Sequence, residues 1–285
     1  MRKFDIQLFA ATHTLYDNFV LERKMTGIVN TLLDARSLMT IDTSLVENAG
    51  MKKTINKYTY TGAVEKLNQG QKNTTKGKVA FVGQDYTVNR YQETFVYNDM
   101  EVMKDPYMLD VATTGASTSM ANQIRKDYFD ELAKIGNTGE FPAEGLTYDA
   151  IVDALATIDQ EVETGMFVIM NNTQRAQIRK DADFKASANG EILYTGQFGT
   201  IAGLPVLFSK LVPADTVYIT TKEAVKFFVK MEGRVEQSHD VETKDNTVVY
   251  DRFGVAALVD ETKSIKLTKH TSTMEASEKT KKVTK

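Results

Sequence analysis

Three histidines and a few neighbouring side chains are the residues in this sequence whose types could carry catalysis or bind a metal. His13, His239 and His270 lie far apart, and none belongs to a ligand spacing such as H-E-x-x-H. Ser238, His239 and Asp240 include the three residue types of a nucleophilic triad. In a strand, however, the first and third side chains point to one face and the second points to the other. The sequence therefore predicts no triad here.

Two further patterns could bind a cation or a phosphate. Asp181 and Asp183 in "KDADF" lack the glycine and the distal glutamate of a calcium loop, so we interpret them as a solvated helix end. No G-x-x-x-x-G-K-[ST] loop occurs, and no G-x-G-x-x-G follows a strand. Cysteine is absent, which excludes disulfides and thiolate metal sites. We therefore expect no cofactor, no metal and no enzymatic activity, and an enzyme of unknown type is a distant alternative.

The composition is that of a folded protein with a sizeable core. The chain has 285 residues, of which 42% are hydrophobic and 26% are charged. Asp5 and Gln7 interrupt the apolar run near the N-terminus, so we expect no secretory signal. No stretch approaches the ~20 apolar residues that a membrane helix needs. These features predict an intracellular protein without a membrane partner.

The charges are distributed unevenly along the chain. The net charge is −3, yet residues 51–98 carry eight basic and three acidic side chains. One interpretation is a solvated charged hairpin, and another is a basic arm that docks on acidic surfaces of neighbouring copies. A third is a nucleic-acid patch with stacking platforms at Tyr58, Tyr60 and Tyr86, which the acidity of the remaining chain disfavours. The lysines concerned are Lys66, Lys72, Lys76 and Lys78.

The first half of the chain predicts an arm, a hairpin and a long helix. Residues 1–50 contain short helical stretches without a long amphipathic pattern, which favours an extended arm. Period-two alternation on both sides of a polar tip predicts one long β-hairpin over 51–98, and such a hairpin needs a surface to lie on. Apolar residues at every fourth position after Asp105 and Pro106 predict a helix of about thirty residues that ends at Gly136.

The second half predicts a compact α/β section. Thr147 is expected to cap a helix, and the apolar run "MFVIM", Met166 to Met170, is expected to form a strand buried on both faces. Another helix should follow Asn171. Pro205 and Pro213 flank "VLFSKLV", which we interpret as an edge strand with a proline at each border. Antiparallel strands and a polar tail follow, so the fold class is α+β.

This order of elements resembles the tailed-bacteriophage major capsid proteins of the Hong Kong 97 fold. The resemblance extends from "FDIQLFA" near the start to "GVAALVD" near the end. Its most specific part is "FVIMNNTQRAQIRKDADF" followed by "GTIAGLPVLFSKLVPADTVYI". In these stretches a buried strand, an asparagine, a helix and a Gly-x-Pro-Val strand ending in serine form a packing motif. Its residues here are Asn171, Gly203, Pro205 and Ser209.

The resemblance implies a division of the chain into the parts of that fold. These are an N-terminal arm, an extended E-loop β-hairpin, a P-domain with a long spine helix and an α/β A-domain. The implied boundaries are 1–50 for the arm, 51–98 for the E-loop, 99–136 for the spine helix, 137–230 for the A-domain, 231–270 for the P-domain return strands and 271–285 for a disordered tail.

The resemblance also implies a function and partners. The chain would be a major capsid protein that self-assembles through pentamers and hexamers into an icosahedral shell around double-stranded phage DNA. Because E-loops of this family lie across neighbouring subunits, Lys66, Lys72, Lys76 and Lys78 would make inter-subunit contacts. A separate scaffolding protein and a portal are expected partners, and a decoration protein is an optional one. An acidic shell should enclose DNA without binding it specifically. The protein would be part of the virion and would assemble in the bacterial cytoplasm.

An alternative with the same fold is the shell protein of an encapsulin-like bacterial nanocompartment. Such a shell would enclose a cargo enzyme and would have no portal. A nucleic-acid-binding module, from a different class of protein, would instead show a strongly salt-dependent affinity for DNA.

Overall fold

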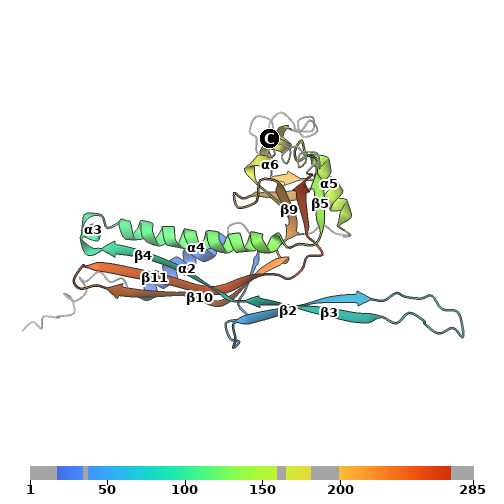
Figure 1. Cartoon of the computed structure of the whole chain (residues 1–285), viewed down its shortest axis with the longest axis horizontal. Helices are drawn as coiled ribbons and strands as arrows, with labels where there is room; N and C mark the ends of the chain where they lie inside the picture. Colours follow the sequence, from blue (N-terminus) through green and yellow to red (C-terminus); the bar gives the residue numbers. More distant parts are fainter. Residues whose placement is uncertain (1–17, 35–37, 159–164, 181–198, 271–285) are drawn as a thin grey trace, which may run out of the picture.

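The structure is a computed structural model that describes residues 18–34, 38–158, 165–180 and 199–270. It has an elongated body in which a long helix lies on a sheet, a lobe above one end of that body, and a hairpin that projects from the same end (Figure 1). Among the helices that the structure describes, none is both long enough and apolar enough to cross a membrane.

The body is built on a four-stranded sheet with the order β1-β10-β11-β4. Strands β10 and β11 pair antiparallel, as do β11 and β4, and β1 is parallel to β10. The long antiparallel pair gives the body its length. The strands are β1 (Thr40–Asp42), β4 (Asn89–Asn98), β10 (Val225–His239) and β11 (Asp245–Leu258).

Helix α4 (Met108–Leu132) is the long helix of the body and contacts β4, β10 and β11. It has 25 residues, shorter than the expected thirty, because the chain first makes a turn in which Asp105 Oδ1 accepts the N–H of Tyr107 at 3.0 Å. The predicted apolar stripe along α4 is confirmed from Ala116 onward, where its members are buried, whereas Met108 and Ala112 at its start are only partly buried. The buried members include Met120, Ile124, Tyr128 and Leu132.

Helix α2 (Asn18–Asp34) corrects the expectation of an extended arm for the residues that the structure describes. It packs against α4 and β10 and joins the main core. The physical reason is a stripe of apolar side chains at every fourth position, which brings them to one face of the helix. The stripe consists of Leu21, Met25, Val29 and Leu33.

The lobe is a second, six-stranded sheet with the order β5-β12-β9-β6-β8-β7. Helices α5 (Tyr148–Thr157) and α6 (Asn172–Lys180) pack with its strands in one apolar cluster. The opposite face sends Phe167, Ile169 and Tyr218 into the core of the body. The strands are β5 (Thr138–Phe141), β6 (Met166–Met170), β7 (Thr200–Ile201), β8 (Leu204–Phe208), β9 (Thr216–Thr221) and β12 (Ile265–Lys269).

Two local predictions in the lobe are confirmed. Thr147 caps α5, with its hydroxyl accepting the N–H of Ala150 at 3.3 Å. All five residues of β6 are buried, and this strand lies between β8 and β9. The sequence predicts β8 as an edge strand, and this is wrong. The two-residue strand β7 pairs with β8 on its outer side and forms the edge of the sheet.

Two segments pair differently from their sequence pattern. The expected hairpin over 51–98 ends at Thr87, and β4 instead pairs with β11 in the body. Likewise, 231–270 is divided between the sheets, since β12 pairs with β5 and β9 in the lobe. Strand β10 already begins at Val225, before the expected boundary at 230. Alternation in the sequence predicts strands but carries no information on which strand each one pairs with.

Candidate interaction surface

The candidate catalytic residues that the structure describes lie in separate local contacts. His239 Nδ1 lies 2.8 Å from Asn246 Oδ1, whereas Asp240 Oδ1 accepts the N–H of Glu242 at 2.8 Å in a turn. His270 pairs with the exposed Glu140. Over residues 18–34, 38–158, 165–180 and 199–270, no three His, Cys, Asp or Glu residues are grouped so as to hold a metal. The candidates His13, Asp181 and Asp183 lie outside the described residues.

Two of the packing-motif residues, Asn171 and Ser209, lie just after the ends of β6 and β8. Asn171 Nδ2 donates to the Val212 carbonyl at 2.7 Å, and the N–H of Ser209 donates to the Met170 carbonyl at 3.1 Å. Ser209 is buried, and its Oγ accepts the N–H of Leu211. These contacts link β6 to the loop that follows β8.

The other two motif residues shape the turn from β7 into β8. Gly203 has φ +80° and Ala202 has φ +49°, both in the left-handed region. Pro205 is opposite Thr200 of β7 in the antiparallel register. The structure thus places Asn171 and Ser209 just after β6 and β8, and Gly203 and Pro205 at the turn into β8, and their value as a marker of an A-domain stays a prediction.

The hairpin is a two-stranded ribbon of β2 (Lys52–Thr61) and β3 (Lys78–Thr87). In its register Tyr58 is opposite Phe81 and Tyr60 is opposite Val79, so these four side chains share one face. The rings of Tyr58 and Phe81 lie 6.2 Å apart. All four side chains are about two-thirds exposed, at 64 to 69%. We call them the aromatic face; sequence reasoning missed it because it depends on the register.

The tip of the hairpin, residues 62–77, is organised by Glu65. The Glu65 carboxylate accepts the N–H of Thr74 at 2.9 Å and the Thr74 hydroxyl at 2.7 Å, and it also accepts the Thr75 hydroxyl. These hydrogen bonds, that from the Thr75 hydroxyl first, lower the pKa of Glu65 to about 2. The tip therefore holds its one carboxylate in its own hydrogen bonds at neutral pH.

The four lysines that composition singled out all lie at the outer end of the hairpin. Three belong to the tip, and Lys78 is the first residue of β3. All four are exposed, and none makes an ion pair with any residue that the structure describes. The structure therefore leaves their charge available to another molecule, and their predicted inter-subunit contact stays a prediction. They are Lys66, Lys72, Lys76 and Lys78.

The root of the hairpin is packed on the body through its other face. Tyr86 is buried in a small cluster with Phe228 and Val255, and its hydroxyl donates to the Leu258 carbonyl at 3.4 Å. Burial raises the pKa of Tyr86 to about 12. The ammonium of Lys53 lies 4.8 Å from the ring centroid of Phe228. This burial removes Tyr86 from the nucleic-acid interpretation, because it cannot offer its ring for stacking beside Tyr58.

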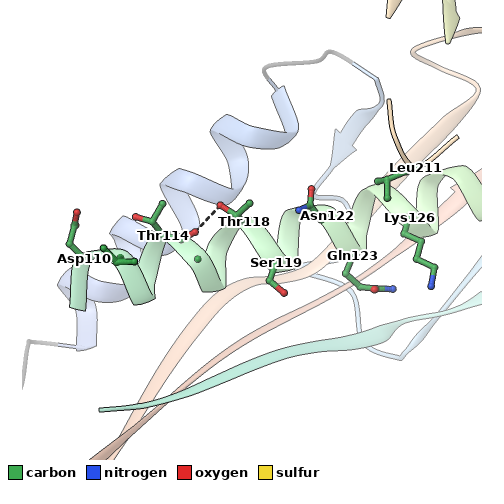
Figure 2. Close-up of a pocket in the computed structure, with 10 residues that line it drawn as sticks. Asp110, Thr114, Thr118, Ser119, Asn122, Gln123, Lys126 and Leu211 are labelled. Atoms are coloured by element: carbon green, nitrogen blue, oxygen red, sulfur yellow. Dashed lines mark hydrogen bonds between the residues drawn. The ribbon is translucent and has the colours of Figure 1, made fainter. Parts of the chain in front are cut away.

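A groove runs along the exposed side of α4 (Figure 2). It has a volume of about 920 Å³ and begins at Asp110. Leu211 and Lys126 lie at its far end (Figure 2). Small side chains leave the floor open, and Val111 is 69% exposed. The hairpin projects away from α4, which carries the groove, and its tip points beyond the end of the body (Figure 1). The other lining residues are Thr114, Gly115, Thr118, Ser119, Asn122 and Gln123.

Comparison with known proteins places these features in a family context. The family model described as "Phage capsid protein" matches residues 82–267, which is more than half of the chain. A curated relative, the "Major capsid protein" of Staphylococcus phage phiMR11, is 26% identical over 159 residues. That match covers 54% of this chain and 57% of the relative, so it spans just over half the length of each.

Solved structures share the fold at low sequence identity. The mature capsid of bacteriophage PhiM1 matches with a TM-score of 0.62 and 12% identity, covering 83% of this chain and 87% of that chain. A virus-like particle from Pyrococcus furiosus matches with a TM-score of 0.57 and 12% identity, covering 87% and 98%. The mixed helix and strand architecture described above is therefore similar to that of capsid and virus-like shells.

Proposed function

The chain belongs to the phage capsid protein family, and from that premise we propose that it is the major capsid protein of a tailed phage, with the Hong Kong 97 fold. The protein would self-assemble through pentamers and hexamers into an icosahedral shell around double-stranded DNA. It would be a component of the virion that assembles in the host cytoplasm. Its work would be structural and not enzymatic, with a scaffolding protein and a portal as partners and a decoration protein as an optional one.

Within this function we assign the parts of the fold to the observed elements. The hairpin β2–β3 would be the E-loop, and α4 with the sheet β1-β10-β11-β4 would be the P-domain with its spine helix. The six-stranded lobe would be the A-domain. These assignments shorten the E-loop of the sequence-based division to 52–87 and move 265–269 into the A-domain.

The observation that carries the proposal is the hairpin itself. A two-stranded ribbon is marginal in water when it packs on nothing, and here its outer half exposes the aromatic face and four lysines that form no ion pair with a described residue. Because the hairpin points away from α4 of its own chain, the matching surface would come from a second copy. The hairpin would therefore dock on a neighbouring subunit.

Charge and shape favour the start of α4 as the docking place. The aromatic face would fill the open groove, whose floor of small side chains leaves room for rings. Lys66 follows Tyr60 by six residues, at most about 20 Å of extended chain, so the tip would extend past the groove. There it would meet the carboxylates of α3 (Asp99–Lys104) and the turn into α4. These carboxylates are Asp99, Glu101 and Asp105.

Electron microscopy of the overexpressed protein tests the proposed function directly. We expect closed shells, tubes or ring-shaped capsomers, since hundreds of identical weak contacts drive closure of such a shell. A protein that stays monomeric at high concentration, with and without coexpression of its genomic neighbours, would contradict the proposal.

Charge reversal tests the docking step. Reversing Lys66, Lys72, Lys76 and Lys78 to glutamate should block assembly and leave the subunit folded, because all four are exposed and make no ion pair within the described chain. A matched control reverses four exposed lysines elsewhere, namely Lys180, Lys222, Lys244 and Lys263. Equal loss of assembly in both variants would assign the effect to net charge and would refute a specific contact of the hairpin.

An encapsulin-like nanocompartment remains the alternative, favoured by the 98% coverage of the Pyrococcus furiosus virus-like particle. The contents of purified particles separate the two functions. A phage shell should carry nuclease-protected DNA when made with its packaging partners, whereas a nanocompartment should carry a single cargo protein.

A further inference from the structure

Glu261 lies in the turn between β11 and β12, where the hairpin and the end of α4 approach each other. Its Oε1 atom pairs with Lys57 Nζ of β2 at 2.9 Å. Its Oε2 atom accepts the N–H of Gly136, just after α4, at 3.2 Å. One carboxylate therefore connects the hairpin to the end of the helix on which the body is built.

The backbone of Glu261 is itself fixed. Its carbonyl accepts Asn137 Nδ2 at 3.2 Å and the N–H of Ser264 at 3.1 Å. Ser264 is fully buried and shares a hydrogen bond of 2.9 Å with Thr220 in β9. The carboxylate thus projects from a turn anchored in the lobe, so it can act as a fixed point for a more mobile partner.

Among the described residues, Lys57 makes the outermost polar contact between the hairpin and the body. Nearer the root, Lys53 and Tyr86 also contact the body. Beyond Lys57, within the part of the chain that the structure describes, the hydrogen bonds and ring contacts of residues 58–82 stay inside the hairpin. The side chains of Lys57 and Glu261 are 31% and 33% exposed, so water screens the pair only in part.

The contact between Lys57 and Glu261 lies near the root of the hairpin, so a small rotation there moves the tip by a large distance. Residues 57–70 span up to about 40 Å of extended chain at ~3.3 Å per residue. A rotation of about 10° at the root would therefore displace the tip by about 7 Å, more than the reach of an ion pair. Small changes at the root would move the lysines of the tip away from any fixed partner.

We propose that Glu261 is a positioning residue that fixes the direction of the hairpin by holding Lys57 against the end of α4. Its effect on assembly rests on the proposed function, because direction matters only when the hairpin docks on a second copy. Its effect on the hairpin itself does not depend on that function and is measured on unassembled subunits.

Because the sequence contains no cysteine, spin labels attach only to cysteines that are introduced for the experiment. Spin labels on Asn73→Cys at the tip and Lys126→Cys on α4 report the distance between hairpin and body by pulsed electron resonance. In the parent pair we expect one narrow distance distribution. Glu261→Gln, which keeps an acceptor for the Gly136 N–H but loses the charge, should broaden or shift it. Lys57→Met should do the same.

Glu236→Gln is the matched control, because it removes the same charge from an exposed ion pair with Arg234 inside one strand. Its distribution should equal that of the parent. The proposal is overturned if Glu261→Gln and Lys57→Met leave the distribution unchanged, even when they lower the melting temperature. A broadened distribution with normal shells would uphold the positioning role and would count against docking by the hairpin.

Discussion

Arg252 is fully buried beneath α2, where its Nη1 atom donates a hydrogen bond of 2.9 Å to Asn30 Oδ1. The guanidinium also lies 5.8 Å from the ring centroid of Phe227, and burial lowers the pKa of Arg252. A buried cation is costly unless it is hydrogen-bonded, so Asn30 ties α2 to the sheet through a charge that water cannot reach.

Replacing Asn30 by alanine should therefore lower the free energy of unfolding by more than the loss of a hydrogen bond at the surface would. We expect Asn30→Ala to lower the free energy of unfolding by about 1–3 kcal/mol, since it leaves a buried donor without its acceptor. Urea unfolding of unassembled subunits measures the loss. Thr31→Ala, on the exposed side of the same helix, should change stability by less than about 0.5 kcal/mol. Equal effects of the two substitutions would show that the buried contact contributes nothing special.

The close approach of α2 to β10 at Gly233 leads to a second prediction. A Cβ atom at this position would lie 2.4 Å from Thr26 Oγ1 and 2.9 Å from the Tyr250 ring. Gly233→Ala should therefore push α2 from the sheet and destabilise the subunit by about 1–3 kcal/mol, as overpacking does elsewhere. Thermal unfolding measures the shift.

Gly115 in α4 is the matched control, because nothing lies within 4 Å of its added Cβ. Gly115→Ala should raise stability by up to about 1 kcal/mol, since alanine favours helix. If both alanines changed the melting temperature in the same direction, the steric account of Gly233 would be wrong.

Local signals in the sequence predicted much of this fold. The cap at Thr147, the buried strand β6 and the apolar stripe of α4 all depend on residues close together in the sequence. Helix α2 was missed although its stripe of four apolar residues is equally local, because short helical stretches without a long amphipathic pattern favoured an extended arm over residues 1–50.

The pairing of the strands could not be predicted from the local sequence pattern. Alternation runs on from β3 into β4, so the sequence cannot show that the chain changes partner at Val88, whose N–H donates to the Met51 carbonyl at 2.8 Å. The candidate interaction surface could likewise be predicted only in part from the sequence. Composition identified the lysines, whereas the aromatic face needs the register, and Lys57 and Glu261 are 204 residues apart.

The carboxylate of Glu261 makes hairpin anchoring dependent on pH. The bond from Lys57, together with that from the Gly136 N–H, lowers the pKa of Glu261, against the opposing effects of burial and Asp260. A lowered pKa in the folded state adds stability that is complete above the ordinary glutamate value and declines as pH falls toward the folded value. Anchoring should therefore be intact at pH 7 and weaken as the pH falls below the ordinary glutamate value of about 4.5.

The test compares urea midpoints of the parent and Glu261→Gln across this range. The difference between them should be largest near neutral pH and should shrink on acidification, because protonation removes the charge that the substitution removes. Tyr86 and Glu131 lie close by, and Tyr86 stays neutral throughout because its pKa is raised to about 12. A difference that stayed constant down to pH 3 would assign the effect of the substitution to packing and not to charge.

A substitution on the aromatic face should impair assembly without changing the stability of the subunit. Phe81→Ser removes a ring that is 67% exposed in the single chain, so the free energy of unfolding of the subunit should change by less than about 0.5 kcal/mol. If that ring is buried against a second copy, each contact loses on the order of 2 kcal/mol, and the loss is repeated at every site in a shell. Light scattering should then show few or no particles, with the melting temperature of the subunit unchanged.

Val241→Ser, at an exposed turn on the body, is the control and should assemble normally. Normal shells from Phe81→Ser would show that the aromatic face stays in water in the assembled particle, and the partner surface of the hairpin would then have to be its lysines alone.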